Sequence, residues 1–370
     1  MVNRWGEKMI EKGKISSSQF AILVTMFTIG SAAMLIPTLL TLEIKQDAWI
    51  GAVFGVIFGL LFVSLYSSLG KKNGEYTLVE SCEKLLGKWI GKPLSFLYIF
   101  YFLSLTAALL RQLGDFMTTQ IMPNTPLQAI ILLATAVMIY GTRLGLESLA
   151  RTAQLIFPWL ILFFILIIIA TMPNIDWQKI QPVYEHGTLS IMRAGYIFLG
   201  IPFLDFVIFL MIFPYVNDQS AAKKAFLTGT VVGGLIIVII TALSILIFGH
   251  YLTSVNFFAP YVLAKKITIG NFPARIEAVF GGIWFIGTII KITVCFYASV
   301  LGFAQCLHFR DYRFLIMPFA IIAVVLSILM FPNIVFFYYV ALNIWTSYSL
   351  VFGVFLPFLL LIISIFRKRV

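Results

Sequence analysis

Two ionisable residues lie within long apolar stretches of this 370-residue sequence. Lys291 is surrounded by GGIWFIGTIIKITVCFYAS (residues 281–299), and Asp205 by YIFLGIPFLDFVIFLMIFPYV (residues 196–216). A charge in apolar surroundings is costly unless it is paired, so we expect Asp205 to be the countercharge of Lys291. Two roles of the ammonium group stay open. It takes the place of a coupling cation, or it tethers the carbonyl groups of a broken helix.

A second pair of charged residues, Arg111 and Asp115, is spaced four residues apart. This spacing places both side chains on one face of a helix, so we expect a structural ion pair. The histidines, cysteines and acidic residues form no metal motif, phosphate loop, Ser-His-Asp order or paired-carboxylate site. The sequence therefore predicts a protein that is not an enzyme and that uses no cofactor or metal.

The amino-acid composition indicates lipid as the main solvent of the chain. Hydrophobic residues make up 61% of the sequence and charged residues 11%, whereas soluble domains carry about 25% charged residues. The formal net charge is +11, but the basic residues lie in short connections between apolar runs. This pattern is typical of membrane topology and argues against a nucleic-acid partner.

Ten apolar segments are candidates to cross the bilayer, which needs about 20 residues per helix. They are Phe20–Leu42, Trp49–Leu69, Leu94–Ile121, Leu127–Tyr140, Leu149–Met172, Leu189–Val216, Ala225–Phe248, Ile276–Leu307, Phe314–Met330 and Ile334–Phe366. We therefore expect an all-α integral membrane protein with ten transmembrane helices. Pro357 lies in the tenth segment and predicts a kink or a break there.

The distribution of basic residues predicts the orientation. If the N-terminus is inside, most of the basic residues fall in inner connections and few in outer ones. Residues 1–19 and 367–370 are then both cytoplasmic. The inner connection 71–92 predicts a helix on the membrane surface, and the outer segment 255–270 predicts a lid helix over a vestibule. For both segments, an ordinary packed loop helix is the alternative.

Two segments combine membrane-spanning length with residues that weaken a helix. Gly30-Ser31 interrupts the first span, and Gly200-Ile201-Pro202 interrupts the sixth. Breaks in the leading spans of two five-span halves are typical of transporter binding sites, because unwound backbone offers donors and acceptors at mid-membrane. A zwitterionic amino acid suits both kinds of helix end. The alternative is that these residues serve only close packing and kinks.

Three stretches resemble the B subunits of spore germinant receptors. They are ISSSQFAILVTMFTIGSAAMLIP (residues 15–37), YGTRLGLESLARTAQLIFPW (residues 140–159) and PARIEAVFGGIWFIGTIIKITVCFYAS (residues 273–299). The run Arg275-x-Glu277…Trp284…Lys291 is the most specific of these motifs. The resemblance extends over nearly the whole chain.

The resemblance implies membership of the amino acid–polyamine–organocation superfamily. It implies the leucine-transporter (LeuT) fold, with two inverted five-helix repeats over residues 20–172 and 189–366 and broken first and sixth helices. It also implies a place in the inner spore membrane or cell membrane. There the subunit binds a nutrient, expected to be an amino acid, and works with an A-type membrane subunit and a C-type lipoprotein to trigger germination.

The resemblance also suggests a ligand pocket. Its expected residues are Ile29, Gly30, Ser31, Ala32, Phe198, Leu199, Gly200, Ile201 and Pro202, with Thr106 and Thr288 added by estimated depth. Amide groups near Ser31–Ala33 are expected to hold the ligand carboxylate, and carbonyl groups near Phe198–Gly200 its ammonium. Lys291 is expected to brace the first span.

Three functions agree with these features: a nutrient receptor, a proton-coupled amino-acid transporter, and a structural membrane subunit. The receptor is the function that we predict, and the transporter is the alternative. The sequence alone separates these two poorly, because a receptor derived from a transporter can keep the same site.

Overall fold

The computed structural model describes residues 13–265 and 276–366. In these ranges the helices are joined by turns and loops, and one isolated bridge links Ile15 and Val216. The α-helices are α1 Ser17–Ile44, α2 Ala48–Asn73, α3 Leu78–Phe116, α4 Leu127–Leu144, α5 Leu146–Thr171, α6 Gly187–Phe198, α7 Gln219–Val255, α8 Ala259–Lys265, α9 Ile276–Cys306, α10 Ile316–Leu329, α11 Ile334–Asn343, α12 Trp345–Leu350 and α13 Leu356–Phe366. Most of the predicted terminal segments, and residues 266–275 with Arg275, lie outside the described residues.

Capping side chains fix where the long helices begin. At α1, the Ser16 hydroxyl accepts a hydrogen bond from the Gln19 amide, and the Gln19 side chain accepts one from the Ser16 amide. Thr77 and Glu80 form the same capping box at the start of α3. Each box pairs two backbone donors that a helix N-terminus otherwise leaves unpaired.

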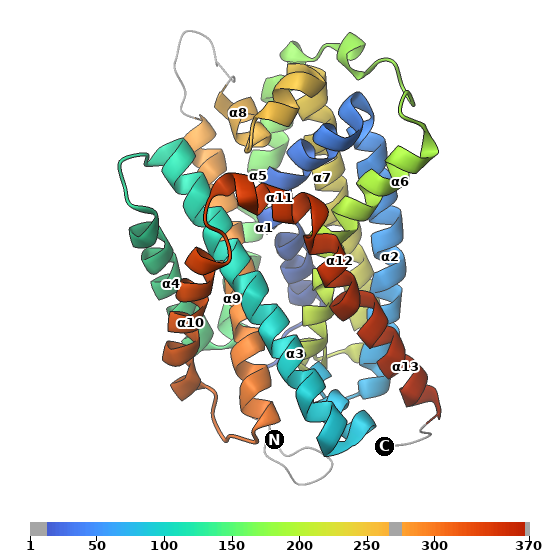
Figure 1. Ribbon diagram of the computed structural model, residues 1–370, viewed down its shortest axis with the longest axis vertical. Helices are drawn as coiled ribbons and strands as arrows, with labels where there is room; N and C mark the ends of the chain where they lie inside the picture. Colours follow the sequence, from blue (N-terminus) through green and yellow to red (C-terminus); the bar gives the residue numbers. More distant parts are fainter. Residues whose placement is uncertain (1–12, 266–275, 367–370) are drawn as a thin grey trace.

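The helix α1 is the central element of the bundle. Every residue from Leu23 to Thr41 is buried, and α1 packs against α5, α7 and α9. Figure 1 shows α4 and α10 together at one side, and α13 at another, with the start of α1 and the end of α13 at the same end of the molecule. Large apolar side chains of α5, α10 and α13 are exposed, as expected for helices that face lipid.

The predicted count of ten spans is not confirmed. In the described residues, eight helical stretches are long and apolar enough to cross a membrane, or nine if the pair Arg313–Leu329 and Ile334–Asn343, bent by 94°, is one span. The first stretch, Ser17–Asn73, contains the first two predicted spans. Ten spans, and their division into two repeats, therefore stay predictions.

The predicted break in the first span is wrong. The helix α1 runs through Gly30, Ser31 and Pro37 without interruption. Neighbouring side chains supply extra hydrogen bonds at the weak points, since Thr288 Oγ1 donates to the Gly30 carbonyl at 2.5 Å and Gln112 Nε2 to the Ser31 carbonyl at 3.1 Å. Partners of this kind let membrane helices tolerate Gly and Pro.

Gly30 lies at a close contact between α1 and α9. A Cβ atom added at Gly30 would lie 3.1 Å from the carbonyl oxygen of Gly287 and 3.3 Å from Cβ of Lys291. The small residues near Gly30 therefore serve the close packing that was the alternative explanation of the sequence. The amides of Ser31–Ala33 lie inside a continuous helix, so they are not the free carboxylate donors that we expected.

The predicted break in the sixth span is confirmed. The helix α6 ends at Phe198, a π-helical turn covers Leu199–Phe203, and a 3₁₀-helix follows over Asp205–Met211. Ile201 has non-helical angles, with φ −134° and ψ 102°. Pro202 has no amide hydrogen to continue the helix, which explains the local change of geometry.

The tenth span is divided more finely than the sequence predicts. The helix α11 ends at Asn343, α12 follows after Ile344, and a π-helical turn over Val351–Phe355 precedes α13. Pro357 is the second residue of α13, so the predicted irregularity lies directly before it. Such π-turns are common where a membrane helix changes direction.

The irregular parts of the sixth and tenth spans pack against each other at two glycines. A Cβ atom at Gly200 would lie 2.8 Å from Cβ of Thr346, and one at Gly353 would lie 2.7 Å from the carbonyl oxygen of Leu204. The hydroxyl of Tyr66 in α2 donates to the Gly353 carbonyl at 2.7 Å. The two spans therefore meet backbone to backbone, and Tyr66 supplies a donor at this contact.

Both predicted connections contain a helix in the described residues. Residues 78–86 form the first part of α3, before Gly87 interrupts it with a φ of 78°. Leu78 and Cys82 of this part are buried, so it packs against the bundle. In the other connection, α8 covers residues 259–265, and Phe258 and Tyr261 contact the ring of Phe116 edge to face. A surface helix and a lid over an outer vestibule stay predictions.

Candidate binding cavity

A small cavity lies between α1, α3, the broken sixth span and the tenth span. Its volume is about 30 Å³, which is enough for at least one water molecule. The lining residues are Ser31, Leu35, Leu105, Ala108, Leu109, Gln112, Ile201, Asp205, Phe331, Phe337, Val340, Ala341 and Trp345. Ser31 lies at the middle of the 28-residue helix α1, so the cavity is near the centre of the bilayer if α1 spans it.

The expected pairing of Lys291 with Asp205 is present beside this cavity. Lys291 Nζ lies 3.9 Å from Asp205 Oδ2, and it donates a hydrogen bond of 2.6 Å to Ser31 Oγ. The ammonium also lies 4.3 Å from the centre of the Phe27 ring, a distance at which a cation is attracted to the ring face. Lys291 and Asp205 are both fully buried. The ammonium thus links α9 to α1 and to the sixth span.

The carboxylate of Asp205 is only half satisfied. Oδ1 accepts a hydrogen bond of 2.7 Å from the hydroxyl of Tyr101, whereas Oδ2 has no hydrogen-bond donor among the described residues. The indole of Trp345, which also lines the cavity, lies near this carboxylate. A buried acceptor without a donor is unfavourable, so Oδ2 is a place where a ligand donor would be stabilised.

One face of α3 forms a wall of the site. Tyr101, Leu105, Ala108 and Gln112 are spaced by four, three and four residues, which places them on one side of a helix. Tyr101 contacts Asp205, and the other three line the cavity. The amide group of Gln112 reaches α1 at the Ser31 carbonyl. This face therefore connects the first and sixth spans through polar side chains.

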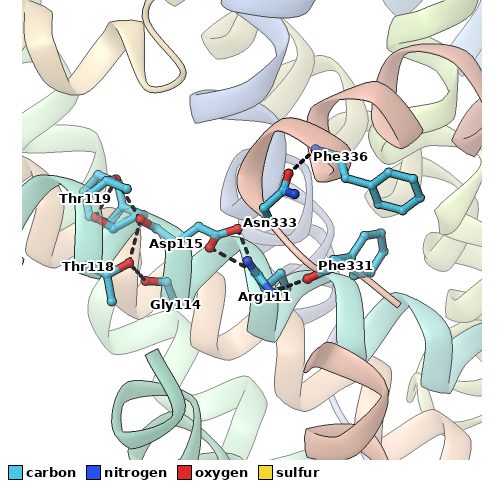
Figure 2. A network of polar contacts seen from close by, with 9 residues as sticks. Arg111, Gly114, Asp115, Thr118, Thr119, Phe331, Asn333 and Phe336 are labelled. Carbon is cyan, nitrogen blue, oxygen red and sulfur yellow. Dashed lines mark hydrogen bonds and ion pairs between the residues drawn. The ribbon is translucent and has the colours of Figure 1, made fainter. Parts of the chain in front are cut away.

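The predicted ion pair of Arg111 and Asp115 is also present, next to Gln112 on α3. Arg111 Nε lies 2.9 Å from both carboxylate oxygens of Asp115, and Arg111 Nη1 donates to the carbonyl group of Phe331. Figure 2 shows this network at the corner between α10 and α11, where Asn333 caps α11. This geometry is that of a structural ion pair, because Arg111 holds the corner against α3 while Asp115 neutralises its charge.

The structure places some of the predicted site residues in the wall of the cavity and the others outside it. Ser31, Ile201 and Asp205 line it, whereas Gly30 and Thr288 meet at the contact between α1 and α9. The remaining predicted residues that are buried outside the lining are Ile29, Ala32, Thr106, Phe198, Leu199, Gly200 and Pro202. The first of these, Ile29, lines a separate apolar cavity with residues of α5, α7 and α9. The expected pocket therefore shares Ser31 and Ile201 with the lining of this cavity, and the assignment of ligand-binding residues stays a prediction.

Comparison with known proteins identifies the family. The family described as spore germination protein matches residues 14–335, which is most of the chain. The chain belongs to the spore germination protein family. The predicted resemblance is thus confirmed. Members of this family are multi-pass membrane proteins of a transporter-like, non-enzymatic type.

This spore germination protein has relatives of similar length. It is 28% identical over 364 residues to spore germination protein KB of Bacillus subtilis (strain 168), covering 97% of each chain. It is 25% identical over 363 residues to spore germination protein YndE of the same organism, covering 96% of this chain and 98% of that one. The alignments therefore include the whole cavity region.

A solved transporter structure shows the fold class. The spore germination protein matches Mhp1, a nucleobase-cation-symport-1 family transporter in a closed conformation with bromovinylhydantoin bound, with a TM-score of 0.69. The match covers 97% of this chain and 80% of that one, at 12% sequence identity. At this identity the likeness shows the fold alone, which is LeuT-like.

The site of this spore germination protein includes residues that sequence reasoning missed. Gln112, Tyr101 and Trp345 place polar atoms in or beside the cavity, and none was predicted. The helical spacing of Tyr101 and Gln112 on one face of α3 was a usable signal. Trp345 gave no such signal, because its position depends on the irregular geometry at Ile344.

Proposed function

We propose that this chain is the nutrient-binding membrane subunit of a spore germinant receptor, and that the nutrient is an amino acid bound at the cavity. The cavity volume of about 30 Å³ is smaller than an amino acid, so the surrounding elements move apart when the ligand enters. The observation that carries this proposal is the convergence of Ser31, Gln112 and Asp205 on one buried cavity beside the broken sixth span. Ligand sites typically combine mostly apolar walls with a few placed polar groups.

Ligand binding would act by shifting a conformational equilibrium. A ligand in the cavity contacts α1 and α3 on one side, and the sixth and tenth spans on the other. It therefore stabilises the arrangement in which all of these elements contact it, relative to the arrangement without ligand. In this proposal, an A-type membrane subunit and a C-type lipoprotein of the inner spore membrane receive that change.

A cavity-filling variant tests the proposal. Ala108→Phe places a ring in the cavity from α3, while Leu97→Phe, on the exposed face of the same helix, is the matched control. We expect spores with Ala108→Phe to lose the response to the nutrient while the subunit remains at its normal level. An unchanged response at normal abundance would contradict the assignment of the cavity.

Proton-coupled amino-acid transport is the second candidate function. The fold likeness to a cation symporter and the buried pair of Lys291 and Asp205 favour it. Uptake of radiolabelled amino acids into proteoliposomes separates the two functions. The receptor proposal predicts binding without accumulation, whereas accumulation driven by a proton gradient would establish transport.

A further inference from the structure

The cavity contains one strong acceptor that pairs with Lys291 electrostatically but accepts no hydrogen bond from the described residues. Asp205 is 1% exposed, and its Oδ2 atom accepts no hydrogen bond from the described residues. The nearest cation, Lys291 Nζ, is 3.9 Å away, which is beyond hydrogen-bond distance. An ammonium or amine group of a ligand would meet this oxygen as a charged acceptor.

The two cations near the cavity already have partners in the protein. Lys291 donates to Ser31 Oγ at 2.6 Å and pairs with Asp205 at 3.9 Å, and Arg111 is bound to Asp115 and to the Phe331 carbonyl. Within the described parts of the chain, no lysine or arginine side chain lines the cavity. A ligand whose only charged group is a carboxylate would therefore bring a second negative charge close to Asp205, with Lys291 as the shared cation for both, which is unfavourable.

A second polar corner can receive a carboxylate that arrives together with an ammonium. Ser31 Oγ accepts from Lys291, which leaves its hydroxyl hydrogen to donate. Gln112 Nε2 uses one of its two hydrogens on the Ser31 carbonyl, so the other hydrogen can donate to a ligand. The nearby ammonium of Lys291 adds a favourable positive charge behind Ser31. The corner thus offers donors to a carboxylate.

The remaining wall is apolar and suits an uncharged side chain. It is formed by leucine, alanine, valine and phenylalanine residues of α1, α3 and α11, with Ile201 and the ring of Trp345. A polyol such as a sugar would leave several hydroxyl groups without partners against these side chains, which disfavours its binding.

We propose that Asp205 and the corner of Ser31 and Gln112 determine specificity, and that they select an amino acid with an apolar side chain. Asp205 Oδ2 binds the ligand ammonium, and Ser31 Oγ and Gln112 Nε2 bind its carboxylate. This assignment rests on the proposed function, because it names the ligand class and the contacts of the same cavity. It replaces the backbone amides of α1, which the continuous helix keeps paired.

Amino acids, and compounds that lack either their amine or their carboxylate, test the assignment on the unmodified protein. The full chain in lipid nanodiscs is titrated with L-alanine, L-valine, L-leucine and L-phenylalanine, and affinity is measured by calorimetry. Each amino acid that binds is compared with the acid that lacks its amine and the amine that lacks its carboxylate, such as isovalerate and isobutylamine for L-valine. D-glucose is the polyol probe. We expect the amino acid to bind most tightly, the amine more weakly, and the acid and D-glucose not at all.

Variants then test the individual contacts. The double variant Asp205→Asn/Lys291→Met removes both charges together, so no uncompensated ion is left buried. We expect it to weaken amino-acid binding by about 30-fold or more, as for loss of a buried charged contact. Gln112→Leu should weaken binding of the amino acid and leave binding of the amine unchanged. Asp311→Asn, on the exposed surface, is the control, and the melting temperature of each variant reports its folding.

The outcomes separate this inference from the proposed function. Equal binding of the acid and the amino acid, or full affinity in the folded double variant, would overturn the inference. If a compound without an amine binds and Ala108→Phe abolishes that binding, the cavity is the site and the assignment of Asp205 is wrong. If none of the tested compounds binds the unmodified protein, the proposed amino-acid function fails and this assignment fails with it.

Discussion

Gly30 approaches the carbonyl oxygen of Gly287 at the contact between α1 and α9, but Cβ atoms added at the two glycines would have different surroundings. A Cβ atom at Gly30 would be closer to α9 than ordinary van der Waals distance, whereas one at Gly287 would have nothing within 4 Å. The two glycines therefore give a matched pair for testing whether close approach or helix weakness is the reason for glycine at position 30.

We expect Gly30→Ala to destabilise the protein and Gly287→Ala to be neutral or stabilising. The methyl group at position 30 has to push α1 from α9, and overpacking of this kind costs about 1–3 kcal/mol. At position 287, alanine adds about 1 kcal/mol of helix propensity without a clash. Thermal unfolding in detergent measures both effects. If Gly30→Ala raises the melting temperature, the close contact is not the reason for glycine at this position.

Lys291 illustrates a buried charge whose removal leaves a second charge behind. We expect Lys291→Ala to destabilise the protein by about 3–5 kcal/mol, because Asp205 then loses its countercharge and Ser31 its donor. Lys224→Ala, at an exposed site at the start of α7, should change stability by less than about 0.5 kcal/mol. The melting temperature and the amount of protein in the membrane check this result, and normal values for Lys291→Ala would contradict it.

At the scale of elements, α11 covers one side of the cavity. Phe337, Val340 and Ala341 of α11 line it. The corner before α11 is held by Arg111, and the hydroxyl of Tyr338 donates to the carbonyl of Phe257 in the segment before α8. Access to the cavity from this side therefore requires α11 to separate from α3 and from this segment.

We expect loss of the Arg111 contact to loosen α11. The double variant Arg111→Leu/Asp115→Leu removes the ion pair without leaving one charge unpaired. A hydrogen bond to a charged group contributes about 1.5–3 kcal/mol, so the open state should become about 10-fold or more populated. The rate at which a maleimide labels Ala341→Cys reports this opening, since the three native cysteines are buried.

The exposed pair of Arg151 and Glu147 on α5 provides the control. It has the same four-residue spacing but lies at the surface. Replacing both of its residues by leucine should leave the labelling of Ala341→Cys unchanged. Equal labelling in the two double variants would mean that Arg111 does not hold α11 closed.

Individual residues explain which elements were predictable from the sequence. Pro202 interrupts a helix because proline has no amide hydrogen. The break in the sixth span could therefore be predicted from the local sequence alone. The side chains that donate to the carbonyl groups of α1 at Gly30 and Ser31 are Thr288 and Gln112, which come from other helices. Similarly, the break at Ile344 has no proline or glycine to mark it. Local weakness was visible in the sequence, but the side chains that compensate for it were not.

At the scale of the whole molecule, the basic residues predict that both chain ends are cytoplasmic. A reporter protein that is active only in the cytoplasm measures this orientation. We expect it to be active when fused to the N-terminus and when fused to the C-terminus. A fusion in the connection after Asn174, which is predicted to be outside, serves as the control. Reporters on opposite faces would contradict both the orientation and the even number of spans.

The contact between the sixth and tenth spans has a consequence for the evolution of the family. Gly200 leaves no room for a side chain beside Thr346, and Gly353 leaves none beside Leu204. At both glycines the added atom would lie within 3.0 Å of a backbone atom of the opposite residue, and no substitution opposite removes that atom. Positions 200 and 353 are therefore expected to remain glycine in an alignment of relatives, whatever side chains occupy positions 346 and 204.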